Sequence, residues 1–212
     1  MRFSRPWIAI VAGLGLLVGS STAARAEGLS ADETARLERG ETIVREQTID
    51  NDERHFVGGI TYTIVEGTVQ ELTSLFEDVS AYQRLLPKTK RARLVGINGP
   101  DHFVELVQGN ALLETSYTIR VRAYPEIGEV RFWLDPTRPH GIDDAWGYFR
   151  GTELPDAPDG THRALLTYGA LVDLGGSLVG EMYEERLRAL MLSVPQLVRR
   201  YVQRTLHGRP HT

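Results

Sequence analysis

The sequence predicts an α+β fold in which a curved antiparallel sheet of about seven or eight strands wraps around a long C-terminal helix. A helix, a break and a second short helix at residues 68–87 follow the first core strand directly. Six strand-like runs come next, with turns but no helical segment between them. The last segment, about residues 177–206, has the broad apolar face of an amphipathic helix. A sheet must curl round such a helix to bury that face, and a cavity can form between the two.

Capping residues mark the starts of the helix pair. Thr68 with Glu71, and Ser80 with Gln83, place a hydroxyl and a carboxyl or amide three residues apart. In that spacing each pair can satisfy backbone N–H groups that a helix start leaves unpaired. Pro87 has no N–H and disfavours helical geometry at the residue before it, so we expect the second helix to end there.

Upstream of the pair, the sequence predicts a short helix and two strands. Ser30 and Glu33 form a third capping box, which opens an exposed lead-in helix. Strand-like segments follow at residues 41–49 and 56–67. Between residues 60 and 65, large apolar residues alternate with Thr, Thr and Val. This alternation is typical of a strand with one buried face.

The central part of the chain alternates strand-like runs with turn residues. Turns are expected at residues 98–100, 125–128 and 155–160, which are rich in Pro, Gly, Asn and Asp. An antiparallel meander is the natural arrangement of strands joined in this way. The six runs lie at residues 91–97, 102–109, 111–124, 129–135, 145–154 and 162–174.

The C-terminal helix contains an internal proline. Pro195 should kink it, because proline cannot donate to the carbonyl four residues earlier, and so frees the carbonyl near Met191. After Glu185 the chain has six arginines and no acid. These cations either complement the negative end of the helix dipole or contact a membrane surface transiently.

The N-terminal residues have the pattern of a secretory signal peptide. Arg2 and Arg5 precede an apolar run at residues 7–18, and Ala24-Arg25-Ala26 is a typical cleavage site. The alternative is an uncleaved membrane anchor, but about twelve apolar residues fall short of the roughly 20 that a spanning helix needs. We therefore expect cleavage near Ala26 and an exported, periplasmic protein.

Composition excludes several classes of function. The chain of 212 residues has no cysteine, so disulfides, thiolate zinc sites and a cysteine nucleophile are excluded. Its formal net charge is −4, and losing the signal arginines makes it more acidic, so no nucleic-acid partner is expected. We divide the chain into a signal peptide (1–26), a lead-in helix and strand (27–58), one ligand-binding domain (59–206) and a flexible tail (207–212).

One segment carries a resemblance to a known family. The order of elements resembles the START-like (SRPBCC) helix-grip superfamily. Residues 78–87, DVSAYQRLLP, are similar to the D-v-x-x-Y-x-x-x-x-P segment of its polyketide cyclase/dehydrase and coenzyme Q-binding branch. The lead-in, residues 29–44, resembles that of exported bacterial members, and the likeness extends over about residues 29–204. It implies a cavity and an apolar ligand; because the superfamily holds lipid carriers, receptors, cyclases and hydrolases, it implies nothing narrower.

The expected cavity is built from aromatic, apolar and a few polar side chains. Tryptophan and tyrosine combine apolar rings with a polar edge, and methionine gives adaptable apolar surface. The residues expected to bind the ligand are Tyr82, Leu86, Pro87, Arg120, Trp133, Trp146, Tyr148, Tyr168, Met182 and Leu190.

Each of these assignments has an alternative. Arg120 and Arg122, like Arg131, Trp133 and Asp135, fall on alternate strand positions, and such positions can equally form the solvent side of a curved sheet. The aromatic residues can pack in the core without touching a ligand.

No catalytic residue, metal site or cofactor is assigned from the sequence. The six histidines show no HExxH or comparable helical pairing, and Ser177 lacks the glycine two residues later that a nucleophile elbow requires. His140, Asp143 and Asp144 lie in a loop where they could form an acid–base pair or cap turns.

The function expected from these observations is binding or carriage of a hydrophobic small molecule, such as a lipid, an isoprenoid or a polycyclic compound, between sheet and helix. The first alternative is a cyclase or isomerase that uses polar residues in the same cavity. The second is an interaction module whose core is filled by its own side chains.

Overall fold

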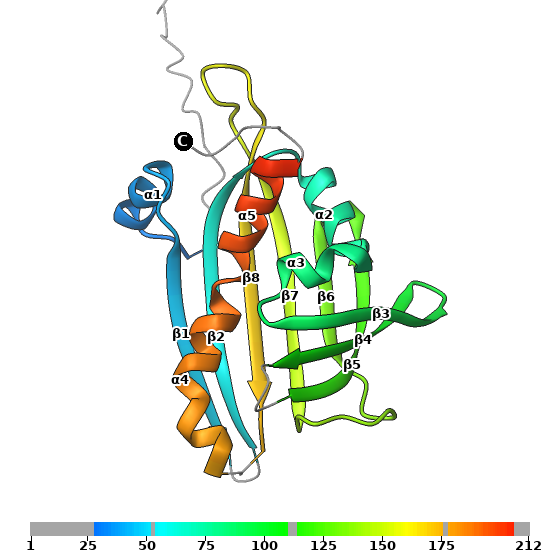
Figure 1. Cartoon of the computed structure of the whole chain (residues 1–212). Helices are drawn as coiled ribbons and strands as arrows, with labels where there is room; N and C mark the ends of the chain where they lie inside the picture. The colour runs from blue at the N-terminus through cyan, green and yellow to red at the C-terminus, as the bar shows by residue number, and fades with distance from the viewer. Residues whose placement is uncertain (1–27, 52–53, 110–113, 176–177, 206–212) are drawn as a thin grey trace, which may run out of the picture.

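The computed structural model describes residues 28–51, 54–109, 114–175 and 178–205, so the expected signal peptide and tail lie outside it. One long sheet carries helices on its two faces (Figure 1). Along the chain the elements are α1 (Ala31–Glu38), β1 (Ile43–Asn51), β2 (Arg54–Glu66), α2 (Val69–Glu77), the 3-10 turn η1 (Val79–Ala81), α3 (Tyr82–Leu85), β3 (Thr89–Asn98), β4 (Asp101–Gly109), β5 (Glu114–Tyr124), the 3-10 turn η2 (Pro125–Ile127), β6 (Glu129–Leu134), β7 (Asp144–Leu154), β8 (Arg163–Asp173), α4 (Leu178–Leu192) and α5 (Val194–Thr205).

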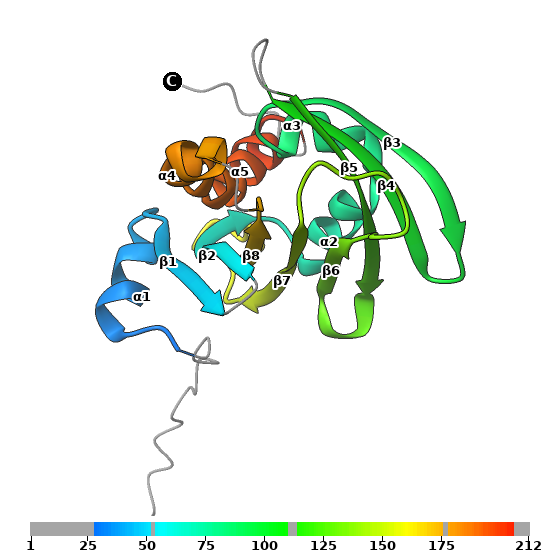
Figure 2. The same cartoon turned by 90° about the horizontal axis from the view of Figure 1, so that it is seen from below.

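The sheet has eight strands in the order β1-β2-β8-β7-β6-β5-β4-β3, and every neighbouring pair is antiparallel. The predicted fold class is confirmed. Because β2 pairs with β8, the first and last core strands meet in the middle of the order. Seen from below, the sheet curves and α4 and α5 lie within the curve (Figure 2). None of the helices in the described part of the chain is long and apolar enough to cross a membrane.

The helix pair after β2 forms largely as expected. Thr68 and Glu71 make the complete capping box of α2, and the residue before Pro87 is extended, which ends α3. The prediction of a second box at Ser80 and Gln83 is wrong. Asp78 is the cap instead, since its carboxylate accepts from the Ser80 N–H at 2.9 Å, while the Gln83 side chain donates to β3.

The C-terminal helix is broken, not merely bent. The break falls at Ser193, whose hydroxyl donates to the Leu190 carbonyl, so α4 ends and α5 begins just before Pro195. The break leaves the Leu192 carbonyl without a helical partner. The buried Thr61 hydroxyl of β2 donates to that carbonyl at 3.0 Å and so joins the break to the sheet.

Strand β2 is buried on both faces, which corrects the prediction of one buried face. Thr61, Thr63 and Val65 are fully buried on its concave side, where β2 contacts α4 and α5. On the convex side Tyr62 packs with Leu37 of α1 in a second apolar cluster. The lead-in helix therefore covers part of the sheet, although most of its own side chains are exposed.

The other half of the convex face carries arginines bound to buried carboxylates. Asp101, 5% exposed, accepts from Arg122 at 2.6 Å and also pairs with Arg120. Hydrogen bonds from Arg122 and Arg120 lower the pKa of Asp101 to about 2 despite its burial. These arginines therefore stabilise the outer surface of the sheet.

Candidate ligand-binding site

A cavity of about 800 Å³ lies between the concave face of the sheet, the helix pair and α4. Its walls are mostly apolar: β5 to β8 supply one side, and Leu187, Leu190 and Met191 of α4 face them. The volume falls within the roughly 300–1,000 Å³ of small-molecule sites. A space of this size was expected where a curved sheet receives a helix.

Four aromatic rings form one wall of the cavity. The Phe149 ring stacks on Phe76 with centroids 3.6 Å apart and on Tyr168 at 4.7 Å, and Phe132 lies 6.3 Å from Tyr168. Gly147 makes room for this wall, because a Cβ there would lie 2.4 Å from the Phe132 ring. Stacked rings present flat apolar surface to a guest.

The hydroxyl groups inside the cavity differ in their partners. The Tyr117 hydroxyl donates to the Gln108 side chain, and the Tyr82 hydroxyl donates to the Phe76 carbonyl at 2.6 Å. Within the described part of the chain, the Tyr168 hydroxyl has no hydrogen-bond partner although the residue is 4% exposed. Burial raises the pKa of both Tyr117 and Tyr168, so these groups stay protonated and act as hydrogen-bond donors.

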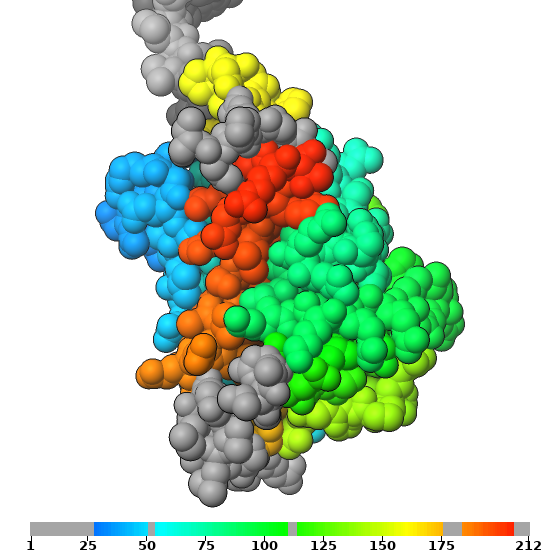
Figure 3. Space-filling model, in the orientation of Figure 1, coloured from blue at the N-terminus to red at the C-terminus, as the bar shows by residue number. Residues whose placement is uncertain are grey.

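The mouth of the cavity lies where its lining residues are exposed. These are Lys88 in the turn from α3 to β3, Glu114 at the start of β5, and Arg186 on α4. In Figure 3, α4 (orange) and the green segment of α3 and β3 lie beside each other on one face of the molecule. The cavity therefore opens between α4 and the turn that contains Leu86 and Pro87.

Five of the ten residues expected at the ligand line the cavity: Tyr82, Leu86, Pro87, Tyr168 and Leu190. Met182 lies outside the residues whose side chains the structure describes. Contact of the five with a ligand stays a prediction.

The remaining four expected residues, Arg120, Trp133, Trp146 and Tyr148, do not line the cavity and lie on the convex face. Trp133 pairs with Trp146 across β6 and β7, and the Arg120 guanidinium lies 4.8 Å from the Trp133 ring centre. The pleat is the reason: neighbouring residues of a strand point to opposite faces, and the inner positions of β6 are held by Val130 and Phe132.

The acid–base candidates of the loop before β7 do not come together. The His140 ring bonds the Ile142 carbonyl at 2.6 Å, and Asp144 pairs with Arg54 at 2.7 Å. Asp135 caps its own turn through Thr137. None of these lines the cavity, and the described residues contain no cluster of three or more potential metal ligands.

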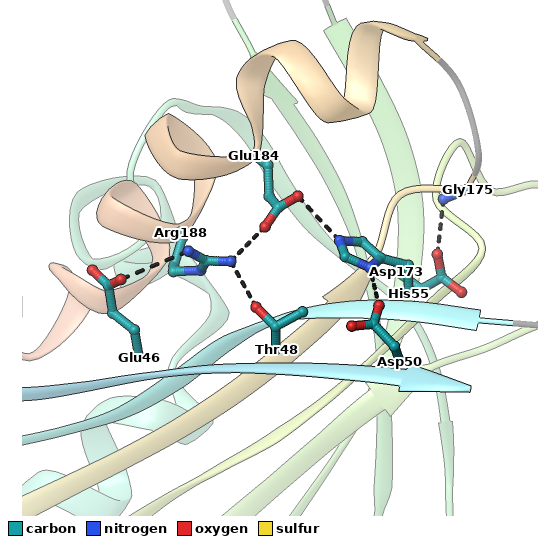
Figure 4. Close-up of polar contacts among 8 residues, drawn as sticks. All are labelled: Glu46, Thr48, Asp50, His55, Asp173, Gly175, Glu184 and Arg188. Atoms are coloured by element: carbon teal, nitrogen blue, oxygen red, sulfur yellow. Dashed lines mark hydrogen bonds and ion pairs between the residues drawn. The ribbon is translucent and has the colours of Figure 1, made fainter. Parts of the chain in front are cut away.

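Polar contacts hold α4 to the hairpin of β1 and β2 (Figure 4). Glu184 bonds His55 at 3.0 Å and also Arg188. Arg188 donates in turn to Thr48 at 2.9 Å, and His55 bonds Asp50 at 2.5 Å. Since most described side chains of α4 are at least partly exposed, these polar contacts are a large part of what fixes the helix over the cavity.

The hold on α4 is expected to weaken as pH rises. Hydrogen bonds to Asp50 and Glu184 raise the pKa of His55 above 6.5. The stabilisation is therefore complete below pH 6.5 and is lost as pH rises through the raised value. Hydrogen exchange of the α4 amides, corrected for intrinsic rates, should be faster at about pH 9 than at about pH 6. His55→Gln should remove the difference; equal protection of α4 at both pH values in the unmodified protein would contradict this role.

No protein-family model matches the sequence, and no curated protein sequence matches it either. Solved structures do match. The STAR-related lipid transfer protein from Xanthomonas axonopodis is 13% identical with a TM-score of 0.56, covering 74% of this chain and 98% of that one. The Zhui aromatase/cyclase from Streptomyces sp. R1128 is 15% identical with a TM-score of 0.51, covering 77% and 96%. The chain has the START-like helix-grip fold.

A third helix-grip match is the protein TTHA0849 from Thermus thermophilus, which is 16% identical with a TM-score of 0.54 and covers 71% of this chain and 98% of that one. At these identities the likeness establishes the fold alone. What this helix-grip protein binds must therefore be argued from its own cavity.

Proposed function

We propose that this protein binds a hydrophobic small molecule in the cavity between its sheet and α4, and that it serves as a carrier for that molecule. The observation that supports this most strongly is the apolar cavity of about 800 Å³ itself. Burying a ligand's apolar surface there contributes about 25 cal/mol per Å². The unpartnered Tyr168 hydroxyl adds a donor that an oxygen on the guest would satisfy.

We place the carrier in the periplasm on the strength of the N-terminal signal pattern. An apolar molecule that crosses an aqueous compartment needs a sheltered cavity, and this supports the same assignment. The names of the two structural neighbours, a lipid transfer protein and an aromatase/cyclase, agree with an apolar guest at the level of the fold.

A cyclase-type enzyme is the less supported alternative. The Arg, Asp and His residues that would have served it lie away from the cavity, and the ionisable groups deep within the described lining are tyrosines that burial keeps protonated. A filled interaction module is disfavoured by the volume of the cavity.

The proposal is tested by titrating the protein with N-phenylnaphthylamine, a neutral probe whose fluorescence rises in apolar surroundings. We expect a saturable rise that corresponds to one site per chain and disappears in denaturant. A rise that never saturates, or no rise at all, together with no uptake of lipid from vesicles, would overturn the proposal.

A further inference from the structure

The charged residues of the described cavity lining are all at its mouth. They are Lys88, Glu114 and Arg186, and each is exposed. The Glu114 carboxylate is bound by Lys90 at 2.6 Å. Within the described part of the chain, Lys88 and Arg186 have neither an ion-pair nor a hydrogen-bond partner for their side chains. The mouth therefore presents two cations whose charge is not balanced locally.

This contrasts with how the chain treats its other cations. Acidic residues outnumber basic ones, 28 to 24, and most described arginines are paired, as Arg188 is with Glu184 on the same helix. Arg84 and Arg200 are also unpartnered among the described residues, but they do not line the cavity. Arg186 and Lys88 are thus distinguished by their place at the opening.

Lys88 is also held in an unusual backbone conformation. Its φ of 58° lies in the left-handed region, which residues other than glycine seldom adopt. The Gly109 N–H donates to the Lys88 carbonyl at 3.0 Å, and the Gln108 amide donates to the Pro87 carbonyl at 3.3 Å. These two bonds fix the turn, and a lysine stands where glycine or asparagine would be less strained. Such outliers persist where the surroundings impose them, often at functional sites.

We propose that the ligand is an anionic amphiphile, with its apolar body in the cavity and a carboxylate or phosphate at the mouth beside Lys88 and Arg186. This rests on the proposed function. An anion cannot enter the apolar interior without a large loss of hydration, so it must stay at the opening. Charge-assisted hydrogen bonds from lysine and arginine are the strong contacts available there, and arginine matches the geometry of both anions.

The test compares three ligands of equal chain length: dodecanoate, dodecyl phosphate and neutral dodecanol. Each displaces N-phenylnaphthylamine from the full-length protein. We expect at least one anion to bind about tenfold more tightly than dodecanol. The double variant Lys88→Gln/Arg186→Gln should lose that preference and leave dodecanol binding unchanged. The matched double variant Arg84→Gln/Arg200→Gln should keep the preference, and all four sites are exposed, so the fold should persist.

The outcomes separate this inference from the proposed function. Preference for dodecanoate or for dodecyl phosphate identifies the anion, and either result supports the inference. Equal affinity for all three ligands, or equal loss of anion binding in both double variants, overturns it while the binding function stands. A weaker association with anionic vesicles in the Lys88/Arg186 variant, without any change in binding of the soluble ligands, would overturn it in favour of membrane contact. If neither ligands nor probe bind, both proposals fail.

Discussion

Replacing Leu187 and Leu190 together by tryptophan is expected to reduce ligand binding by about a hundredfold or more. Both side chains line the cavity from α4 and are only partly covered by protein, so the larger rings can occupy the space meant for a guest. The measurement is titration with N-phenylnaphthylamine, with circular dichroism to establish that the fold is kept.

The matched control replaces Glu185 and Ala189, two exposed positions of the same helix that do not line the cavity, by tryptophan. It should bind the probe as the unmodified protein does. Equal binding by both double variants would mean that the guest does not lie under α4.

Replacing Glu129 by glutamine is expected to lower the free energy of unfolding by about 3 kcal/mol. The Glu129 side chain is 1% exposed and pairs with both Arg131 and Arg150, the latter at 2.5 Å. Removing its charge leaves two guanidinium groups close together with no anion between them. Because both arginines are about half exposed, solvation limits the cost. Urea unfolding measures the change.

The control for this substitution is Glu126→Gln, at an exposed position in the neighbouring turn, which should change stability by less than about 0.5 kcal/mol. A second substitution, Arg131→Gln, should restore part of the loss in the Glu129 variant, because it removes one of the opposed charges. A loss below about 1 kcal/mol in Glu129→Gln would show that the carboxylate is not needed to hold the convex face together.

The fold could be predicted because its signals are local. A capping box at Thr68 and Glu71, a stop at Pro87 and turn residues between runs of alternating side chains depend on neighbours within a few residues. The misplaced cap at Ser80 shows the limit of such signals. Asp78 offers an equally suitable acceptor two residues earlier, and the competition between the two is settled by where α2 ends.

The site was harder to predict, because a sequence shows which residues of a strand share a face but not which face turns inward. Trp133 and Arg131 were correctly placed together, yet the inner face belongs to Val130 and Phe132, the wholly apolar alternate set. That contrast was a usable signal. The role of Gly147 was not predictable, since Phe132 fills its place from the neighbouring strand only in the register of β6 and β7.

Strand β2 illustrates the same limit on a larger scale. Its alternation is real, but burial of the convex side comes from α1, a helix that by itself has the composition of an exposed segment. Only the chain's path back over the sheet brings Leu37 onto Tyr62.

The most direct test of a cavity that holds an apolar guest is native mass spectrometry of the protein purified without detergent from its own cell envelope, followed by organic extraction. We predict a complex heavier than the polypeptide by the mass of one extractable apolar molecule, and its absence from the Leu187→Trp/Leu190→Trp variant. The polypeptide mass alone, from a protein that also takes up nothing from lipid vesicles, would contradict the account.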